Sequence, residues 1–205
     1  MDNTDKLLIV GGAVVVGLIF LTGGAAAAPF VSLRAVRDRV MKQAEWIWRA
    51  GKDQRVEPAL LAAMIDVESS GVVDARGEAG EIGLMQIIPA TGKWICDYSS
   101  AQLADPALNI RCGAIYMRYC LDRFNGNIAA SIAAYNSGPD NVWVDMSRGG
   151  KIVAYSAAKR HAMKVMGRVT DYRVLFRQRY PTYYGLMFRP DQWFLNMGDF
   201  DGLSG

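Results

Sequence analysis

The stretch Pro58–Gly71, PALLAAMIDVESSG, decides how the rest of the chain is interpreted. A proline at its start and a glycine at its end are typical of a helix that begins at Pro58 and runs to about Ser70. One face of that helix combines three apolar side chains with a carboxyl group: Leu61, Met64, Ile65 and Glu68. Burial disfavours the charged form of a carboxyl, and a neutral carboxyl can act as a general acid. The same pattern fits a carboxylate that points to water or caps a neighbour, so the spacing alone leaves both interpretations open.

Helical patterns extend to both sides of this segment. Residues 31–50 carry apolar side chains at helical spacing, and Gly51 is typical of a helix end. Asp105 and Pro106 predict the cap and first turn of a long helix that reaches about Phe124. Further helices are predicted after Pro89 and over 127–136, 151–166 and 168–179. Because no alternating strand pattern of useful length occurs outside the glycine-containing loop 71–83, the sequence predicts a mostly α-helical domain over 31–180.

The first 30 residues differ in composition from the rest of the chain. The stretch Leu7–Phe30 carries no charge, and as a helix it would span roughly 36 Å against ~30 Å for the hydrocarbon core of a bilayer. It therefore predicts one N-terminal transmembrane helix, an anchor within residues 1–30. A cleaved signal sequence is the alternative, because Ala25–Ala28 offers small-residue cleavage sites. The lack of a basic start and the presence of Pro29 beside that site favour the anchor.

Charge and composition narrow the range of partners. The 205 residues carry a net charge of +3, far from the basic surface of a nucleic-acid-binding protein, so no nucleic acid is expected. Three cysteines without a C-x-x-C pair and a single histidine, His161, predict no metal site. His161 is interpreted as part of a solvated helix face, because Lys159, Arg160 and Lys164 surround it. No nucleotide-binding glycine motif is present, and no cofactor is expected.

The cysteines leave the disulfide pattern open. Cys112 and Cys120 lie on one predicted helix, and about 12 Å would separate their Cα atoms, which is too far for a disulfide. Cys96 can pair with either of them. An odd number leaves at least one thiol free or paired with another chain, and three buried thiols that act as small apolar side chains fit equally well. The cysteines therefore do not identify the redox compartment.

Two further segments place polar side chains among apolar ones. In GLMQIIP, residues 83–89, Gln86 is the one polar side chain in an apolar run, and a buried amide needs hydrogen-bond partners. In AYNSGP, residues 134–139, Tyr135 and Asn136 stand at the end of a predicted helix before a turn. Each residue also has an ordinary structural explanation, as a core glutamine, a core tyrosine or a turn-forming asparagine.

The order of these segments resembles the lytic transglycosylases, a family of the lysozyme-like superfamily. The resemblance is collinear over about 55–142 and looser over 168–174. The matching positions are Pro58, Glu68, Ser69, Ser70, Gly71, Gly80, Gly83, Leu84, Met85, Gln86, Ile87, Pro89, Thr91, Asp105, Pro106, Asn109, Ile110, Gly113, Tyr116, Ala134, Tyr135, Asn136, Gly138 and Pro139, with Thr170 and Tyr172 in the looser part. Each motif alone is weak evidence, whereas the ordered set is specific.

The resemblance implies both a fold and a reaction. The fold would be the α-rich, two-lobed lysozyme-like fold with a glycan cleft. Glu68 would be the single catalytic acid and base, cleaving the MurNAc–GlcNAc β-1,4 bond of peptidoglycan with formation of a 1,6-anhydro end and without a metal or cofactor. The candidate substrate-binding residues at matching positions are Gln86, Tyr135, Asn136, Ser69, Met85 and Tyr172. The first three would bind sugar or orient Glu68, Ser69 and Met85 would lie beside the cleft, and Tyr172 is added from the looser part of the match.

One departure from the family pattern keeps a hydrolytic reaction open. The family often has alanine after the loop glycine, whereas Glu81 follows Gly80 here, and Glu78 lies close by. A second carboxylate facing Glu68 across the scissile bond would allow hydrolysis by a retaining or inverting route. The chain would then be a muramidase or, less in keeping with the motifs, a chitinase. Surface positions for both residues are the simpler interpretation.

The location of the domain follows from the substrate. An anchored peptidoglycan-cleaving domain must face the periplasm, but the basic residues of 34–42 after the apolar segment would by the positive-inside rule keep it in the cytoplasm. Those residues are either the polar face of the first helix or a sign of delivery as part of a phage particle. The aromatic tail 181–205 either packs on the domain or binds a partner in a secretion complex or virion. A structural component with little catalysis is the remaining alternative.

Overall fold

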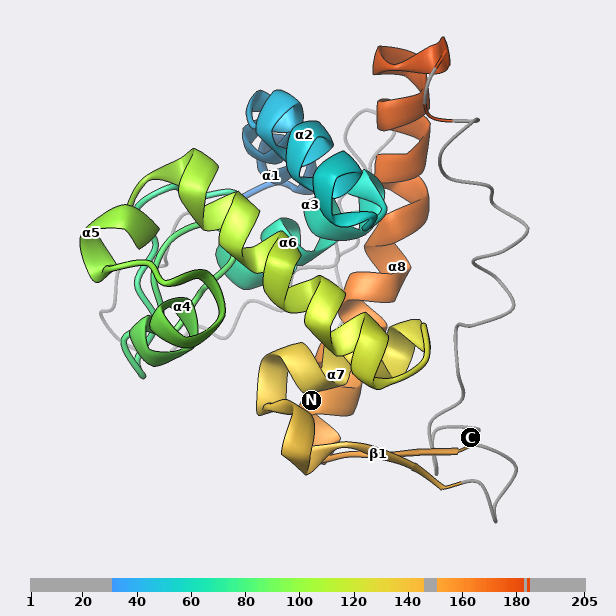
Figure 1. Cartoon of the computed structure of the whole chain (residues 1–205). Helices are drawn as coiled ribbons and strands as arrows, with labels where there is room; N and C mark the ends of the chain where they lie inside the picture. The colour runs from blue at the N-terminus through green and yellow to red at the C-terminus, as the bar shows by residue number, and fades with distance from the viewer. Residues whose placement is uncertain (1–30, 146–150, 183, 185–205) are drawn as a thin grey trace, which may run out of the picture. The chain divides into compact units, whose positions relative to one another are not determined.

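The computed structural model describes residues 31–145, 151–182 and 184 (Figure 1). The elements in chain order are α1 (Leu33–Lys42), α2 (Ala44–Gln54), α3 (Pro58–Ser69), α4 (Pro89–Cys96), α5 (Ser100–Leu103), α6 (Pro106–Arg123), α7 (Ile128–Ser137), the 3-10 helix η1 (Pro139–Asn141), β1 (Trp143–Asp145), β2 (Lys151–Val153) and α8 (Ser156–Arg179). Helices dominate this part of the chain, so the predicted mostly α-helical class is confirmed.

The predicted transmembrane segment, 7–30, lies outside the described residues. Within the described ranges, none of the helices combines the length and the apolar composition that crossing a bilayer requires.

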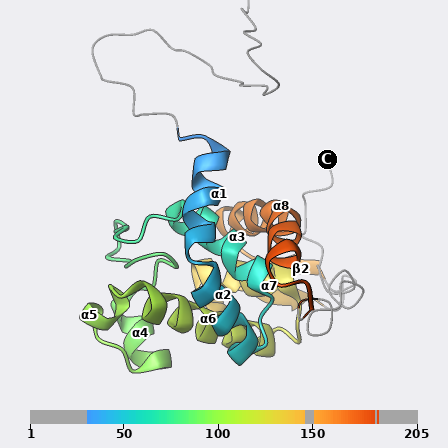
Figure 2. The same ribbon diagram turned by 90° about the horizontal axis from the view of Figure 1, so that it is seen from above.

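Helix α3 forms the centre of the domain. Every residue from Pro58 to Ile65 is buried, and a helix that is apolar all round belongs in a core. Helices α1, α2, α6 and α8 pack against it (Figures 1 and 2). Ser70 ends the helix in the left-handed conformation, at φ 52°, close to the predicted end. Burial decreases in the last turn, where Glu68 lies.

The single helix predicted over 31–50 is wrong, since two helices, α1 and α2, occupy this region. The chain leaves regular helical geometry at Gln43, at φ −93° and ψ 7°. Val40 and Ala44 on either side of the break are both fully buried, so the apolar spacing continues across it. A periodic pattern therefore does not reveal the break.

Gly51 does not end a helix, which corrects the second part of that prediction. Helix α2 continues to Gln54 and ends at Arg55, whose φ is 53°. A Cβ atom at Gly51 would lie 2.7 Å from the backbone oxygen of Val56 and 2.9 Å from a ring carbon of Pro58. The glycine is required by this close approach between α2 and the start of α3.

Helix α6 begins where the sequence predicts. The Asp105 carboxylate accepts a hydrogen bond from the backbone N–H of Leu108 over 2.9 Å, and Pro106 occupies the first turn. A disulfide joins Cys96 at the end of α4 to Cys112 in α6, which is one of the two pairings that the sequence leaves open. Cys120 is a free, buried thiol. The disulfide therefore fixes α4 to α6 next to the cavity described below.

The sequence predicts no strand in the C-terminal half, and this is wrong. Strands β1 and β2 pair as an antiparallel hairpin with Trp143 opposite Val153. Each strand is three residues long, too short for an alternating pattern to stand out.

Helix α8 replaces the two helices predicted over 151–166 and 168–179. Gly167 does not interrupt it, because the glycine faces open space and one glycine costs a helix only about 1 kcal/mol. A continuous buried stripe offsets that cost: Ala158, Ala162, Val165, Val169, Tyr172 and Phe176. This stripe packs α8 along α3 and α7 (Figure 2).

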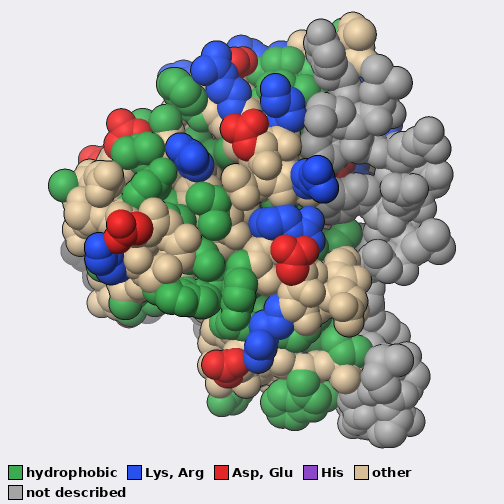
Figure 3. Space-filling model, viewed as in Figure 1, with side chains coloured by type: hydrophobic (Ala, Val, Ile, Leu, Met, Phe, Trp, Pro, Cys, Tyr) green, Lys and Arg blue, Asp and Glu red, His purple; other side chains and the backbone are tan. Residues whose placement is uncertain are grey.

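Beyond α8, Tyr184 is buried and its hydroxyl donates a hydrogen bond to Glu57. At least this residue of the predicted tail therefore packs on the domain. On the face in Figure 3, acidic and basic side chains are interspersed without a continuous field of one sign. That distribution agrees with the small net charge of the chain.

Candidate active site

A cavity of about 330 Å³ lies between α3, α4, α6, α7 and the loop that joins α3 to α4. Its lining residues are Glu68, Gly77, Glu81, Gln86, Ile87, Ile88, Thr91, Tyr116, Tyr135, Asn136, Ser137 and Gly138. Four predicted site residues are among them: Glu68, Gln86, Tyr135 and Asn136. The fold thus brings together residues from three separate segments of the sequence.

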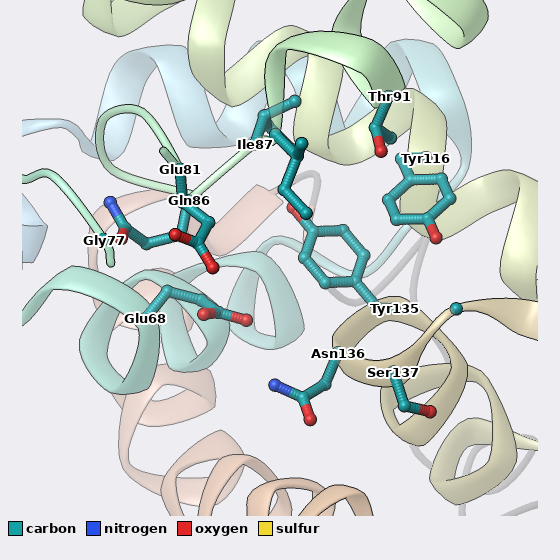
Figure 4. Close-up of a pocket in the computed structure, with 12 residues that line it drawn as sticks. Glu68, Gly77, Glu81, Gln86, Ile87, Thr91, Tyr116, Tyr135, Asn136 and Ser137 are labelled. Carbon is teal, nitrogen blue, oxygen red and sulfur yellow. The ribbon is translucent and has the colours of Figure 1, made fainter. Parts of the chain in front are cut away.

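The carboxyl group of Glu68 points into this cavity from the last turn of α3 (Figure 4). Only 12% of its side chain is exposed. Met64 and Ile65, on the same face, are fully buried. The helix therefore holds the carboxyl where the core meets the cavity, in position to exchange a proton with a bound molecule.

The loop between α3 and α4 presents Gln86 to the same space (Figure 4). Ile82 and Ile87 exchange two backbone hydrogen bonds of 3.0 and 3.1 Å, which close the loop just before α4. Gln86 has φ 47°, a conformation that is unusual for a residue with a side chain. Its amide donates a hydrogen bond to the backbone oxygen of Gly83 over 2.7 Å. The half-buried side chain is thus held in place, with its amide oxygen left for a ligand.

Tyr135 forms the back wall of the cavity. Its hydroxyl donates a hydrogen bond to the backbone oxygen of Met85 over 2.9 Å, which ties α7 to the loop. Burial, reinforced by the nearby charge of Glu68, holds the pKa of Tyr135 well above its ordinary value. The ring centroids of Tyr116 and Tyr135 lie 4.8 Å apart. The two rings therefore form a continuous aromatic wall. Asn136 is exposed at the rim, with its amide toward the cavity (Figure 4).

Three predicted site residues do not line the cavity. The Ser69 hydroxyl donates a hydrogen bond to the backbone oxygen of Ile65 within α3. Met85 is fully buried, and its side chain packs on Gly113, where a Cβ atom would lie 2.3 Å from the sulfur. The Tyr172 hydroxyl donates a hydrogen bond to Asp66 over 2.7 Å. These residues support the site from behind.

His161 does not belong to a solvated face, which corrects its interpretation from the sequence. Only 13% of its side chain is exposed, and its Nε2 lies 3.2 Å from Oε1 of Glu68. The direction of this contact is not that of a regular hydrogen bond, and Nε2 has no other hydrogen-bond partner in the described residues. The sequence signal lies in the helix period, because His161 is three residues after Ala158 and four before Val165, both on the buried stripe.

Two more carboxylates lie in the neighbouring loop. Glu81 lines the cavity together with Glu68, and its Oε2 accepts a hydrogen bond from the backbone N–H of Ala79 over 2.9 Å. Glu78 is exposed and is not part of the cavity lining. Of the two, only Glu81 is placed to influence a bound molecule.

The arrangement suits cleavage of a saccharide. One carboxyl can supply a proton, the amides of Gln86 and Asn136 can bind hydroxyl or acylamino groups, and the aromatic wall can contact the apolar face of a sugar ring. Among the residues that the structure describes, no group of three or more histidine, cysteine or acidic side chains lies together in a way that could hold a metal ion.

Comparison with known proteins places these features in a family. The chain matches the family described as "Transglycosylase SLT domain" over residues 45–166. The transglycosylase of Enterobacteria phage PRD1 is 35% identical over 94 residues, which cover 46% of this chain and 34% of that protein. The soluble lytic murein transglycosylase of Escherichia coli is 35% identical over 111 residues, 50% of this chain and 17% of that protein. The matches thus span about a third or less of these curated relatives.

Solved structures share the fold. The 70-kDa soluble lytic transglycosylase of Escherichia coli superimposes with a TM-score of 0.59 and 26% identity, covering 64% of this chain and 24% of that one. An inactive mutant of a lytic transglycosylase from Pseudomonas aeruginosa gives 0.59 and 25% identity, covering 67% and 25%. The matched region runs from α2 into α8 and contains every residue that lines the cavity. The chain belongs to the transglycosylase SLT domain family.

Proposed function

We propose that this protein is a peptidoglycan lytic transglycosylase that cleaves the MurNAc–GlcNAc β-1,4 bond and leaves a 1,6-anhydro end. The observation that carries the proposal is the position of Glu68, a largely buried carboxyl that points into a cavity together with Gln86, Tyr135 and Asn136. Membership of the transglycosylase SLT domain family supports the same reaction.

In this reaction Glu68 acts first as an acid and then as a base. Its carboxyl gives a proton to the glycosidic oxygen, the C1–O bond breaks, and the acetamido group of the same sugar stabilises the positive charge at C1. The Glu68 carboxylate then takes a proton from the C6 hydroxyl of the MurNAc residue, and that oxygen bonds to C1. No water is consumed, and Glu68 ends as it began. Gln86 and Asn136 would hold the sugar hydroxyl and acetamido groups in register with the carboxyl.

The relatives support a glutamate-dependent mechanism. The Pseudomonas aeruginosa structure is described as an inactive mutant in which a glutamate is replaced by glutamine. The phage and Escherichia coli relatives carry the names transglycosylase and soluble lytic murein transglycosylase. The proposal transfers that activity and its substrate to the present chain.

A hydrolytic muramidase is the second candidate, because Glu81 lines the same cavity as Glu68. Hydrolysis would require the Glu81 carboxylate to act as nucleophile or to activate water. Its hydrogen bond to Ala79 holds that carboxylate to its own loop, which favours the transglycosylase.

Mass spectrometry of digested peptidoglycan tests the proposal. The wild-type chain would be compared with Glu68→Gln, Glu81→Gln and the control Glu78→Gln, which changes an exposed carboxylate outside the cavity. We expect 1,6-anhydro products from wild type, Glu81→Gln and Glu78→Gln, and a loss of at least ~100-fold with Glu68→Gln.

Other results would change the assignment. Reducing ends that disappear in both Glu68→Gln and Glu81→Gln would establish the hydrolytic alternative. The absence of any Glu68-dependent product would contradict the enzyme and favour a structural component of a virion or secretion channel.

We further propose that residues 1–30 anchor the domain 31–180 in a membrane, with the domain facing peptidoglycan in the periplasm. The uncharged stretch Leu7–Phe30 supports an anchor, and a relative from Haemophilus ducreyi is named a membrane-bound lytic murein transglycosylase. The phage PRD1 relative supports the virion alternative. Resistance of the full chain to carbonate extraction from membranes, with its N-terminus intact by mass, would support the anchor. A shortened, extractable protein would indicate a cleaved signal sequence.

A further inference from the structure

The imidazole of His161 and the carboxyl of Glu68 face each other from two different helices. His161 projects from α8 and Glu68 from α3, and Nε2 lies 3.2 Å from Oε1. Both side chains are almost withdrawn from solvent, at 13% and 12% exposure. Since α3 and α8 pack along each other, the contact is built into the core of the domain.

In the part of the chain that the structure describes, neither the Glu68 carboxyl nor Nε2 of His161 has another charged or hydrogen-bonding partner that would compete with this contact. Among the described residues, no lysine or arginine lies within ion-pair distance of Glu68, and Nε2 of His161 has no hydrogen-bond partner. A buried polar nitrogen without a hydrogen-bond partner lowers the stability of the folded state. Its position is therefore not explained by a contribution to stability. Nε2 lies close enough to Oε1 for a regular hydrogen bond to form once a bound substrate orients the Glu68 side chain. Catalytic hydrogen bonds often reach their final geometry only in the enzyme–substrate complex.

We propose that His161 is a positioning residue for Glu68, donating the N–H of Nε2 to Oε1. The inference rests on the proposed function of Glu68. An N–H donor can bond to Oε1 both when the carboxyl carries its proton on Oε2 and when it is a carboxylate. Glu68 passes through both states during one turnover. By holding Oε1, His161 leaves Oε2 to give a proton to the glycosidic oxygen and later to take one from the C6 hydroxyl.

The side chain of His161 itself neither gains nor loses a proton in this scheme. It limits rotation of the carboxyl and stabilises the carboxylate that forms when the glycosidic oxygen is protonated. Its effect therefore falls on the chemical step, and binding of the glycan is left to other residues of the cavity.

Kinetics on soluble glycan strands with the full chain provide the first test. His161→Phe keeps a ring but removes the donor, and we expect a loss of kcat of about 10- to 100-fold with KM changed less than about 3-fold. His161→Gln places an amide N–H at the position of Nε2, and we expect it to restore kcat to within about 5-fold of wild type. The control Arg168→Gln removes a 3.7 Å ion pair with Asp66, between the same two helices and about two turns further along α8. We expect it to leave kcat unchanged.

Nuclear magnetic resonance provides a second test that needs no activity. The chain contains one histidine, so the ring nitrogen signals of histidine-labelled protein belong to His161 alone. At one fixed pH, we expect Glu68→Gln to shift the Nε2 signal, and Arg168→Gln to leave it in place.

The outcomes separate this inference from the proposed function. A wild-type kcat in His161→Phe, or an equal loss in His161→Phe and His161→Gln, would overturn the positioning role. Ring signals that do not respond to Glu68→Gln would overturn the contact itself. A wild-type protein without transglycosylase activity would defeat the proposed function, and the resonance test would still report whether the two side chains interact.

Discussion

The side chain of Asn109 accepts a hydrogen bond from the backbone N–H of Met85 over 2.8 Å. The same amide donates to the backbone oxygens of Ile82 and Leu103 over 2.8 and 2.9 Å. Asn109 is only 1% exposed, so a single buried amide of α6 fixes the loop that presents Gln86 to the cavity. A Cβ atom at Gly83 would lie 2.7 Å from this amide, which is why the loop needs glycine there.

Replacing Asn109 with leucine should destabilise the domain and disorganise the cavity. The change leaves the Met85 N–H and the Leu103 carbonyl buried without partners, at about 1 to 3 kcal/mol each, whereas the Ile82 carbonyl keeps its bond from the Ile87 N–H. We therefore expect a loss of roughly 2 kcal/mol or more in the free energy of unfolding. Urea unfolding measures it. The control is Asn136→Ala, an exposed asparagine, which should reduce activity but change stability by less than about 0.5 kcal/mol. An Asn109→Leu protein as stable as wild type would contradict this account of the loop.

The disulfide between Cys96 and Cys112 should stabilise the domain by restricting the unfolded chain. The cysteines are 16 residues apart, and closing a loop of that size contributes about 3 kcal/mol. We expect reduction to lower the Tm of wild type, and a Cys96→Ala/Cys112→Ala double variant to have the same Tm with and without reductant.

Cys120→Ala is the matched control for the disulfide, since it removes the free thiol and leaves the bond in place. Its Tm should still fall on reduction. Thiol titration of the unfolded, unreduced wild-type chain should find one thiol, and a count of three would show that the bond does not form.

Glu57 and Arg173 form a buried ion pair between the start of α3 and α8. The guanidinium donates two hydrogen bonds of 2.7 and 2.8 Å to the carboxylate, and Glu57 is 2% exposed. Arg173→Met should lower the free energy of unfolding by about 3 to 5 kcal/mol, because it leaves a buried charge without its partner. The double variant with Glu57→Gln should recover part of the loss.

The exposed pair Arg49 and Glu45 offers the comparison. Arg49→Met should lower the free energy of unfolding far less than Arg173→Met does, because water screens exposed ion pairs. Equal losses for Arg173→Met and Arg49→Met in the same unfolding assay would show that burial does not decide the strength of these pairs.

Much of the fold could be predicted because residues next to each helix end indicate where that helix begins or stops. Proline at the start of α3 and the Asp105 cap of α6 lie where expected. The break at Gln43 and the uninterrupted path through Gly167 could not be predicted in the same way. Both depend on which side chains are buried against residues that are distant in the sequence. Val40 and Ala44 are buried on either side of the break, and the buried residues of α8 lie on both sides of the glycine.

The site shows the same division. Glu68, Gln86, Tyr135 and Asn136 meet at one cavity, as their ordered motifs suggest. The charged neighbours Lys159, Arg160 and Lys164 led to the wrong prediction that His161 is solvated. Its spacing from the buried residues of α8 indicates instead that it lies on the buried face of that helix. Its contact with Glu68 forms only when α8 packs against α3. No local sequence pattern could predict that contact.

The domain should lose stability in alkaline solution. Burial raises the pKa of the Cys120 thiol to about 12 and raises the pKa of the Tyr135 and Tyr172 phenols as well. The unfolded chain releases these protons near ordinary values, about 8.5 for a thiol and about 10 for a phenol. Because the folded state holds them more tightly, the stabilisation is complete below about pH 8.5 and is lost as the pH rises toward the folded values.

At pH 10 the thiol alone should account for a loss of about 2 kcal/mol relative to pH 8, and the phenols should add to it at higher pH. Urea unfolding at the two pH values measures the change. Cys120→Ala removes the thiol from the comparison, so its free energy of unfolding should fall by about 2 kcal/mol less than that of wild type over the same interval. Equal falls for wild type and Cys120→Ala would mean that the thiol ionises as readily in the folded domain as in the unfolded chain, in conflict with its complete burial in α6.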